Sequence, residues 1–279
     1  MNIYQIYYDE ATRQKLDPGF IPMNNSRNER SDWREYWPIR HFLLNETIKN
    51  DEFYGFFSPK FQEKTNLTSK DVEVVVNSQN VDIVSFSPFF DQMSYFINPF
   101  IQGDITHPGL LASAQSFIDS QNISIPLNKL VCDCTNTIFC NFFVAKGHFW
   151  KRWIHYCELV FDLCENHPNN PLAQQLNSIV PYKKDEVVAM KVFLIERMVT
   201  LLLVTENFSK GSCNVITLPY VGQLLLSQQK KMIQCDALKQ AFIRTQNPFF
   251  LDCFYENVTE VGLAIKDQIE LNQQISNQQ

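Results

Sequence analysis

The chain has 279 residues, 45% of them hydrophobic, and a formal net charge of −6. This length suffices for one large α/β domain, or for such a domain with a helical appendage. The negative charge argues against a nucleic-acid-binding surface, which needs a basic stripe, and no apolar run is long enough to span a membrane. Residues Met1 to Tyr4 lack the basic and then apolar pattern of a signal peptide. We therefore expect a cytoplasmic protein without a transmembrane segment and without a nucleic-acid partner.

Several well-known catalytic and metal-binding motifs are missing. The sequence contains no Gly-x-Gly-x-x-Gly and no Walker loop, which argues against dinucleotide dehydrogenases and P-loop kinases. It also lacks a Gly-x-Ser-x-Gly elbow and a His-Glu-x-x-His pair. The eight cysteines show no paired Cys-x-x-Cys spacing. We expect them to be reduced, buried thiols.

The first elements in chain order are a strand, a polar loop and a helix. Ile3 to Tyr8 alternates aromatic and β-branched residues and predicts a strand. The loop from Leu16 to Ser31 is rich in turn residues. A helix follows, with Ser31 or Asp32 as its cap and Pro38 early in it. This helix carries two tryptophans and several charges, which favour either buried ion pairs or a binding role.

Two short apolar runs between Asp51 and Pro88 predict buried strands with a helix between them. The runs end at Ser58-Pro59 and at Ser87-Pro88, and proline marks a strand exit because it lacks the N–H of a central ladder. Thr68 or Ser69 caps the intervening helix. Ligands of open α/β sheets bind at the carboxyl ends of parallel strands. The loop from Ser58 to Phe61 is therefore the first candidate for a functional site.

The stretch from Ser87 to Gly109 reads as a long irregular loop that mixes aromatic and polar side chains. It either binds a ligand or covers the core. A helix is expected from Leu110 to Ser120, and strands from Lys129 to Cys132 and from Ile138 to Lys146. From Gly147 a helix carries an apolar stripe that is typical of a core-facing helix.

The helix from Ala189 to Met198 is apolar except for two adjacent charges, Glu196 and Arg197. Neighbouring residues point about 100° apart on a helix, so both charges cannot be fully solvated. One of them must be buried and paired, since burial without a partner is costly. Beyond Gly211, Asn214 to Leu218 predicts a strand, and helices lead to a polar, frayed tail from Glu270 to Gln279.

Three segments resemble GT-A glycosyltransferases, the nucleotide-sugar enzymes. Glu52 to Phe57 is similar to their "dyvgflD" strand, and Asn80 to Val84 to their "nadvv" strand. Cys140 to Trp150 resembles the "yxNxfvakkxfw" segment of bacterial polysaccharide transferases. The slot of their Asp-x-Asp motif holds Ser58-Pro59-Lys60 instead. The resemblance covers about residues 1–205, in pattern more than in invariant motifs.

The resemblance implies an α/β fold of GT-A type with a mixed sheet flanked by helices. Residues 1–210 would form the nucleotide-sugar and acceptor domain, and residues 211–279 a helical extension packed on it. The residues implied on the donor side are Tyr8 and Asp9 for the base and ribose, Ser58 and Lys60 in the motif slot, and Arg27, Arg34 and Arg40 nearby. Cationic side chains would then replace the divalent metal, so no metal cofactor is expected.

The acceptor side is assigned to the Ser87–Gly109 stretch, which lacks Lys and Arg and offers Gln92, Gln102 and His107. We expect it to border one cleft with the Ser58 loop. An inverting transfer needs a carboxylate near the acceptor hydroxyl, and the candidates for this base are Glu196, Asp91 and Asp133.

The expected function is transfer of a sugar from a nucleotide-diphospho-sugar to an oligosaccharide or lipid-linked glycan. The protein would work in the cytoplasm, either free or peripherally attached to the inner membrane. The alternative is a catalytically inactive nucleotide-sugar-binding or assembly subunit. A Rossmann methyltransferase is disfavoured by the missing Gly-rich first turn.

Overall fold

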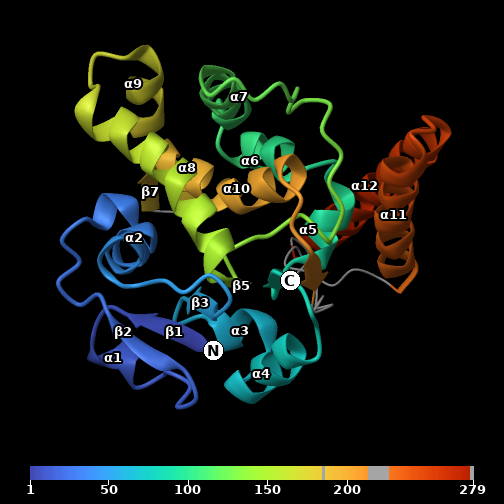
Figure 1. Cartoon of the computed structure of the whole chain (residues 1–279). Helices are drawn as coiled ribbons and strands as arrows, with labels where there is room; N and C mark the ends of the chain where they lie inside the picture. The colour runs from blue at the N-terminus through green and yellow to red at the C-terminus, as the bar shows by residue number, and fades with distance from the viewer. Residues whose placement is uncertain (184–185, 213–225, 277–279) are drawn as a thin grey trace.

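The computed structural model describes residues 1–183, 186–212 and 226–276, and Figure 1 shows them as an α/β fold. The strands are β1 (Asn2–Tyr7), β2 (Ile21–Asn24), β3 (Phe53–Phe57), β4 (Ile83–Ser85), β5 (Phe143–Lys146), β6 (Ile179–Lys183), β7 (Glu186–Ala189) and β8 (Lys210–Ser212). Strands β1, β3 and β4 coincide with predicted apolar runs. These runs supply the β-branched and aromatic side chains that a buried sheet needs.

The described strands form one mixed sheet and one hairpin. Six of them pair in the order β2-β1-β3-β5-β4-β8, while β6 and β7 make an antiparallel hairpin. Strand β1 is parallel to β2 and β3, and β4 is parallel to β8, but β5 is antiparallel to both β3 and β4. The residues that precede β5 therefore lie at the same edge of the sheet as the carboxyl ends of β3 and β4.

Helices flank the sheet and extend beyond it. They are α1 (Glu10–Arg13), the 3-10 helix η1 (Ser31–Trp33), α2 (Tyr36–Asn45), α3 (Phe61–Thr65), α4 (Ser69–Asn77), α5 (Phe90–Tyr95), α6 (Pro99–Thr106), α7 (Leu110–Ser120), α8 (Gly147–Asn166), α9 (Pro171–Asn177), α10 (Met190–Thr205), α11 (Leu226–Thr245) and α12 (Phe249–Ser276). The predicted helix from Leu110 to Ser120 is confirmed as α7. Thr68 caps α4 as expected, in a capping box with Asp71.

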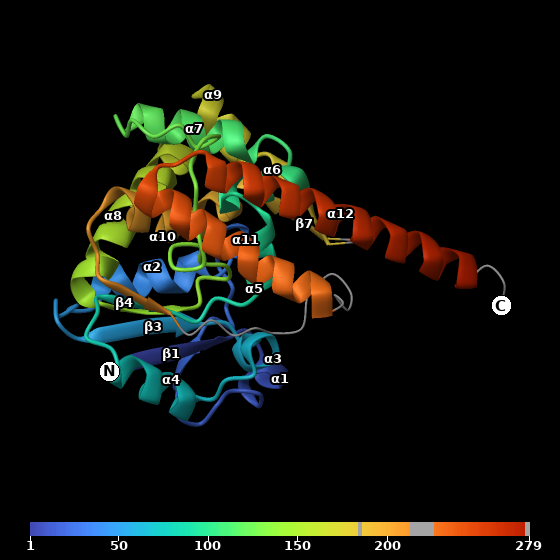
Figure 2. The same cartoon turned by 90° about the vertical axis from the view of Figure 1, so that its right-hand side faces the viewer.

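The two faces of the sheet bury separate hydrophobic clusters. Figure 2 shows α3 and α4 on one side of the sheet, and α2, α8 and α10 on the other. Side chains alternate between the faces of a strand, so Phe57 joins the cluster under α3 and α4, whereas its neighbour Phe56 joins the larger cluster with α2, α8 and α10. The apolar stripe of α8 is buried in that larger cluster, which confirms its expected role as core.

The C-terminal helices α11 and α12 pack against each other and against α5. They share a small apolar cluster that includes Ile97, Met232 and Phe254. Lys239, which is fully buried on α11, donates hydrogen bonds to the carbonyls of Met93 and Phe96. The C-terminal part of α12 extends past the rest of the described chain (Figure 2). The fold class is thus confirmed as α/β with a mixed, helix-flanked sheet and a helical C-terminal part.

Several expected elements are wrong in detail. The Ser87–Gly109 stretch is not an irregular loop, because it contains α5 and α6, and Asn98 caps α6 by accepting hydrogen bonds from two backbone N–H groups. The expected strand from Lys129 to Cys132 is loop. Neither Ser31 nor Asp32 caps α2, since a 3-10 helix precedes it.

The expected strand from Ile138 is also too long, because β5 begins only at Phe143. Cys140 and Asn141 have positive φ angles of 62° and 53°, and this left-handed backbone cannot continue a strand. The strand expected from Asn214 to Leu218 lies outside the described residues. Within the described residues, no helix is both long and apolar enough to cross a membrane.

Candidate functional site

The carboxyl ends of β1 and β3 lie side by side at one edge of the sheet. From β1 the order of strands runs to β2 in one direction and to β3 in the other. In open α/β sheets such a reversal marks the place where ligands bind. Gln5, only 2% exposed, links the two strand ends: its amide donates to the carbonyl of Ser58 at 3.3 Å and accepts from the N–H of Asp17 at 2.9 Å.

Six titratable side chains gather above this edge, and we call them the Lys64 cluster. The members are Tyr8, Glu35, Lys64, Cys140, Tyr182 and Glu196. They come from the end of β1, the segment before α2, helix α3, the segment before β5, the β6–β7 hairpin and helix α10. The pKa of Tyr8 responds to Glu35 and Tyr182, and each of the five other members affects the pKa of at least one member. The fold thus brings together groups that are far apart in sequence.

Lys64 is a half-buried cation whose contacts are a thiol and two aromatic rings. Its Nζ donates to Cys140 Sγ at 3.1 Å and lies 5.7 Å from the centroid of the Phe89 ring and 5.8 Å from that of Phe142. Burial raises the pKa of Cys140 to about 11, so the thiol is neutral near pH 7. Among the described residues, no carboxylate forms an ion pair with Lys64.

Glu196 lies on α10 with 39% of its side chain exposed. Burial nevertheless raises its pKa, Arg197 and Lys64 lower it, and Glu35 raises it. Protein surrounds the carboxylate on most sides, and water reaches it on one. A carboxylate with a raised pKa that solvent can still reach is suited to take up a proton.

Arg197 is the buried member of the adjacent charge pair. It is 5% exposed, and its guanidinium donates to the carbonyls of Pro99 and Phe193, both at 2.8 Å, and to Gln102 Oε1 at 3.0 Å. The distance from its Nη1 to Glu196 Oε2 is 3.9 Å. The expectation that one of the two charges is buried and paired is confirmed, and the partners are carbonyl oxygens rather than the neighbouring carboxylate.

Two tyrosines complete the cluster. The Tyr8 hydroxyl donates to Glu35 Oε1 at 2.9 Å, and burial together with Glu35 raises the pKa of Tyr8. Tyr182 is 44% exposed on the β6–β7 hairpin. Burial and the Glu196 carboxylate raise its pKa to about 12. Both phenols therefore stay protonated at neutral pH, and Tyr8 donates its single hydroxyl proton to Glu35.

The backbone next to Lys64 is strained at two bulky residues. Phe89 and Cys140 have φ angles of 69° and 62°, a region that side chains other than glycine rarely occupy. Both residues contact Lys64. Such strain persists where the surrounding structure enforces it, and it is concentrated at functional sites.

The residues predicted to bind the donor lie in different surroundings. Tyr8 belongs to the Lys64 cluster, whereas Asp9 caps α1 in a capping box. The Ser58 hydroxyl accepts a hydrogen bond from the N–H of Lys60 at 3.3 Å, and the Lys60 residue is exposed. Ser58 and Lys60 do follow β3, at the expected edge of the sheet.

The three predicted donor arginines are engaged with carboxylates. Arg40 forms two hydrogen bonds to Glu158, at 2.6 and 2.7 Å, and Arg34 pairs with Glu186. Arg27 is exposed and lies 3.7 Å from a carboxylate oxygen of Glu29. Arg34 and Arg40 therefore stabilise the fold through charges supplied by distant segments.

The predicted acceptor residues form an internal network around α6. Gln92 accepts from Gln102 at 3.0 Å, and Gln102 in turn accepts from Arg197. His107 is 7% exposed, its Nδ1 lies 3.0 Å from the carbonyl of Pro181, and its ring stacks on Phe193 at 3.5 Å. These three side chains are thus engaged in contacts within the protein.

The two other candidate bases lie in different surroundings from Glu196. Asp91 is in the first turn of α5, two residues after Phe89. Asp133 is 6% exposed, and its Oδ1 accepts from the N–H and the hydroxyl of Thr135 at 2.8 and 2.6 Å. Asp133 therefore closes a turn, whereas Glu196 is the candidate base whose charge raises the pKa of Lys64.

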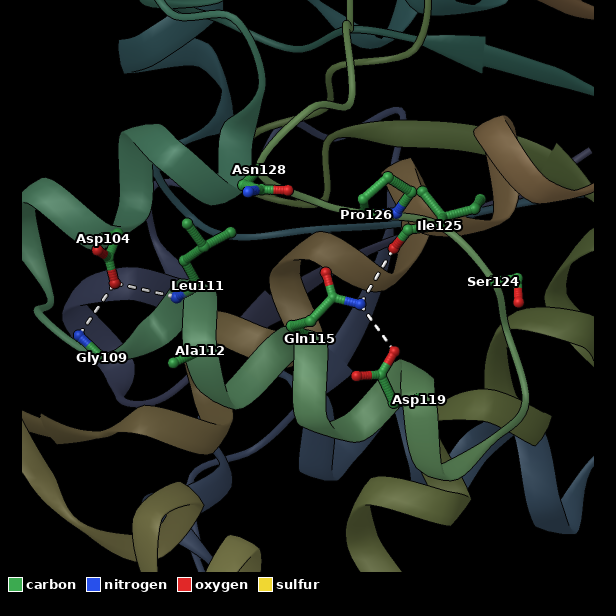
Figure 3. Close-up of a pocket in the computed structure, with 10 residues that line it drawn as sticks. All are labelled: Asp104, Gly109, Leu111, Ala112, Gln115, Asp119, Ser124, Ile125, Pro126 and Asn128. Carbon is green, nitrogen blue, oxygen red and sulfur yellow. Dashed lines mark hydrogen bonds between the residues drawn. The ribbon is translucent and has the colours of Figure 1, made fainter.

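A separate surface pocket of about 690 Å³ lies over α6, α7 and the following loop. Figure 3 shows its polar groups bonded to one another: Asp104 accepts from the N–H groups of Gly109 and Leu111, and the Gln115 amide bonds to Asp119 and to the carbonyl of Ile125. These groups hold the α6–α7 turn and the loop in place. None of its lining residues belongs to the Lys64 cluster.

Comparison of the chain with family models, with curated proteins and with solved structures gives no match. Across the described residues, no three His, Cys, Asp or Glu side chains gather as a ligand set for a metal ion. The functional site is therefore inferred from the geometry of this chain alone.

Sequence reasoning missed four members of the Lys64 cluster: Glu35, Lys64, Cys140 and Tyr182. One signal was present for Lys64, which lies one helical turn after Lys60, beyond the carboxyl end of a predicted strand. Glu35 and Tyr182 carry no local signal, because the fold alone brings them to this edge.

Proposed function

We propose that this protein is a glycosyltransferase of GT-A type that moves a sugar from a nucleotide-diphospho-sugar to a glycan hydroxyl. The observation that carries the proposal is the Lys64 cluster. It contains Glu196, a partly exposed carboxylate with a raised pKa, and Lys64, a cation without an ion pair among the described residues. Sugar transfer needs both kinds of group, since a base activates the acceptor and positive charge stabilises the leaving diphosphate.

Glu196 takes the role of general base in this proposal. Its raised pKa brings its basicity closer to that of a base working near neutral pH than an ordinary carboxylate. The mixed sheet with helices on both faces is compatible with the fold that the sequence resemblance implies. The location of the cluster beyond β1 and β3 agrees with the general rule for ligand sites in α/β sheets.

Tyr8 and Tyr182 supply aromatic rings with polar tips in the cluster that contains the proposed base. Sugars present apolar C–H patches and many hydroxyls, so aromatic rings with polar tips match both features. The acceptor is an oligosaccharide or a lipid-linked glycan, and the nucleotide lies on the side of Tyr8 and Ser58.

A catalytically inactive nucleotide-sugar-binding or assembly subunit is the second candidate. It is favoured by the replacement of the Asp-x-Asp slot by Ser58-Pro59-Lys60, in which Lys60 is exposed and Ser58 holds the turn. Such a subunit would bind a donor and release no product.

A panel of nucleotide-diphospho-sugars separates the two candidates. Thermal-shift screening identifies a bound donor, and release of nucleoside diphosphate then reports turnover, with and without EDTA. The enzyme proposal predicts stabilisation by one donor class and slow product release that EDTA does not abolish. Donor binding without any release supports the inactive subunit, and the absence of binding to every donor contradicts both.

A further inference from the structure

We propose that Lys64 is the anion anchor of the site and binds the diphosphate of the nucleotide donor. This inference rests on the proposed function for the identity of the donor. The binding chemistry itself needs only a diphosphate group. It assigns to a residue of α3 the role that sequence reasoning gave to Lys60 and to three arginines.

No carboxylate among the described residues forms an ion pair with Lys64. Burial lowers the pKa of Lys64, but Cys140, Tyr182 and Glu196 raise it by more, so the ammonium form is favoured. A half-buried ammonium group needs an acceptor or a counter-charge, because it has lost part of its hydration. Its contact to Cys140 Sγ is a weak one, since a neutral thiol is a poor acceptor. The rings of Phe89 and Phe142 offer attraction at more than 5 Å and no hydrogen bond. Lys64 thus retains donors for a ligand.

Other cations in the same part of the sequence are already paired with carboxylates. Arg30, Arg34 and Arg40 each form close ion pairs with a carboxylate. Their partners are Glu165, Glu186 and Glu158, respectively. Lys60 is exposed, and a solvated lysine gives little binding energy because water screens its charge. Lys64 is partly buried and has no ion pair among the described residues, and partial burial strengthens its attraction to an anion.

Lys64 is also held in a fixed position by its neighbours. It lies on α3, directly after the loop that leaves β3, and Phe61 on the same helix stacks on Phe57 with a centroid distance of 4.0 Å. The strained residues Phe89 and Cys140 border its ammonium group. A cation held in this way is preorganised for a ligand, so little conformational entropy is lost on binding.

The arrangement also explains why one cation faces carboxylates without pairing with them. Glu196 and Glu35 both influence the electrostatics of the cluster, yet neither forms an ion pair with Lys64. If the diphosphate lies on Lys64, the carboxylate of Glu196 remains available to the acceptor hydroxyl. Base and anion anchor are thereby kept as separate groups of one site.

Calorimetric titration with inorganic pyrophosphate tests the inference without requiring the donor sugar. Lys64→Met retains the length of the side chain and fits the surrounding Phe89 and Phe142 rings, while the exposed Lys70 of α4 gives the matched control Lys70→Met. We expect Lys64→Met to weaken pyrophosphate binding by about 10- to 100-fold, the value of one charge-assisted hydrogen bond. Lys70→Met should bind like the wild type.

A second measurement uses the wild-type protein alone. Reductive methylation of lysines, read by mass spectrometry, should be slowed at Lys64 by pyrophosphate and unchanged at Lys70. The inference is overturned if the wild type does not bind pyrophosphate, if Lys64→Met binds it as tightly as the wild type, or if Lys60→Met produces the larger loss.

The two proposals fail in different ways. If pyrophosphate binds through Lys64 but no nucleotide sugar is turned over, the proposed glycosyltransferase activity is contradicted and the proposed anion site stands. Turnover that Lys64→Met does not reduce contradicts the anion site and leaves the enzyme.

Discussion

Replacing Arg197 by methionine separates the structural member of the adjacent charge pair from the proposed catalytic one. The guanidinium donates three hydrogen bonds, to Pro99, Phe193 and Gln102, at 2.8 to 3.0 Å. The bonds to Pro99 and Gln102 connect α10, which carries Glu196, to α6, and the bond to Phe193 lies within α10. Methionine fills a similar volume and removes all three bonds. Arg197→Met should therefore loosen α10 on α6 and lower the free energy of unfolding.

The magnitude follows from two opposing contributions. Hydrogen bonds from a charged donor contribute about 1.5–3 kcal/mol each, so three of them give a gross loss of about 4–9 kcal/mol. Removing the guanidinium also removes its desolvation cost, which amounts to several kcal/mol for a buried ion. We expect a net destabilisation of about 2–3 kcal/mol.

Urea unfolding followed by circular dichroism measures this effect, with Glu196→Gln as the matched control on the same helix. The Arg197 variant should show a lower midpoint with an unchanged slope. Burial raises the pKa of Glu196, so the protonated form is favoured in the folded state. The wild type should therefore lose stability relative to Glu196→Gln as the pH rises above 4.5, the ordinary pKa of glutamate. If Arg197→Met unfolds at the wild-type midpoint while Glu196→Gln is strongly destabilised, Arg197 is not the structural member of the pair and this assignment is refuted.

Two further predictions concern the same region. A methyl group on Gly103 would overlap the Arg197 guanidinium and lie 2.5 Å from Leu110 Cδ2, so Gly103→Ala should cost about 1–3 kcal/mol of stability in urea unfolding, and an unchanged midpoint would contradict the packing described. Burial lowers the pKa of His107 below its ordinary value of 6.5, so its neutral form is favoured by folding and the protein should lose stability as the pH falls below 6.5. Melting temperatures measured from pH 7 to 5 should show a smaller loss for His107→Gln, and an equal loss in both proteins would show that His107 is not the group responsible.

Much of the framework could be predicted from local sequence pattern. The helix α7 begins and ends at the predicted residues, and Thr68 caps α4. Strands β1, β3 and β4 coincide with short apolar runs that end in turn residues. These features depend on neighbours within a few positions, which is the range over which sequence periodicity and capping act.

The errors arise where the backbone or a distant partner decides the outcome. Nothing in the sequence indicates that Cys140 and Asn141 take positive φ angles, and these two residues shorten β5. The Ser87–Gly109 stretch contains many turn residues, yet Asn98 uses its side chain to cap α6. Propensity is a weak guide at such positions because tertiary contacts override it.

The candidate site shows the same division. The burial of one charge of the Glu196–Arg197 pair could be predicted from local pattern, and the position of Ser58 at the edge of the sheet from the turn residues that end β3. The partners of Arg34 and Arg40 could not, since Glu186 and Glu158 lie more than a hundred positions away in the chain. These distant carboxylates hold the two arginines in ion pairs that no local pattern indicates.

The most direct test of the account is the pH dependence of product release by the wild type and by Glu196→Gln. With the donor that the thermal-shift panel identifies, the account predicts that wild-type release falls on the acid side, where Glu196 becomes protonated, with a midpoint above the ordinary glutamate pKa of 4.5. Glu196→Gln should bind the donor normally and release product about 10²- to 10⁴-fold more slowly at every pH. A folded Glu196→Gln protein that turns over at the wild-type rate, with the same pH profile, would contradict the central claim.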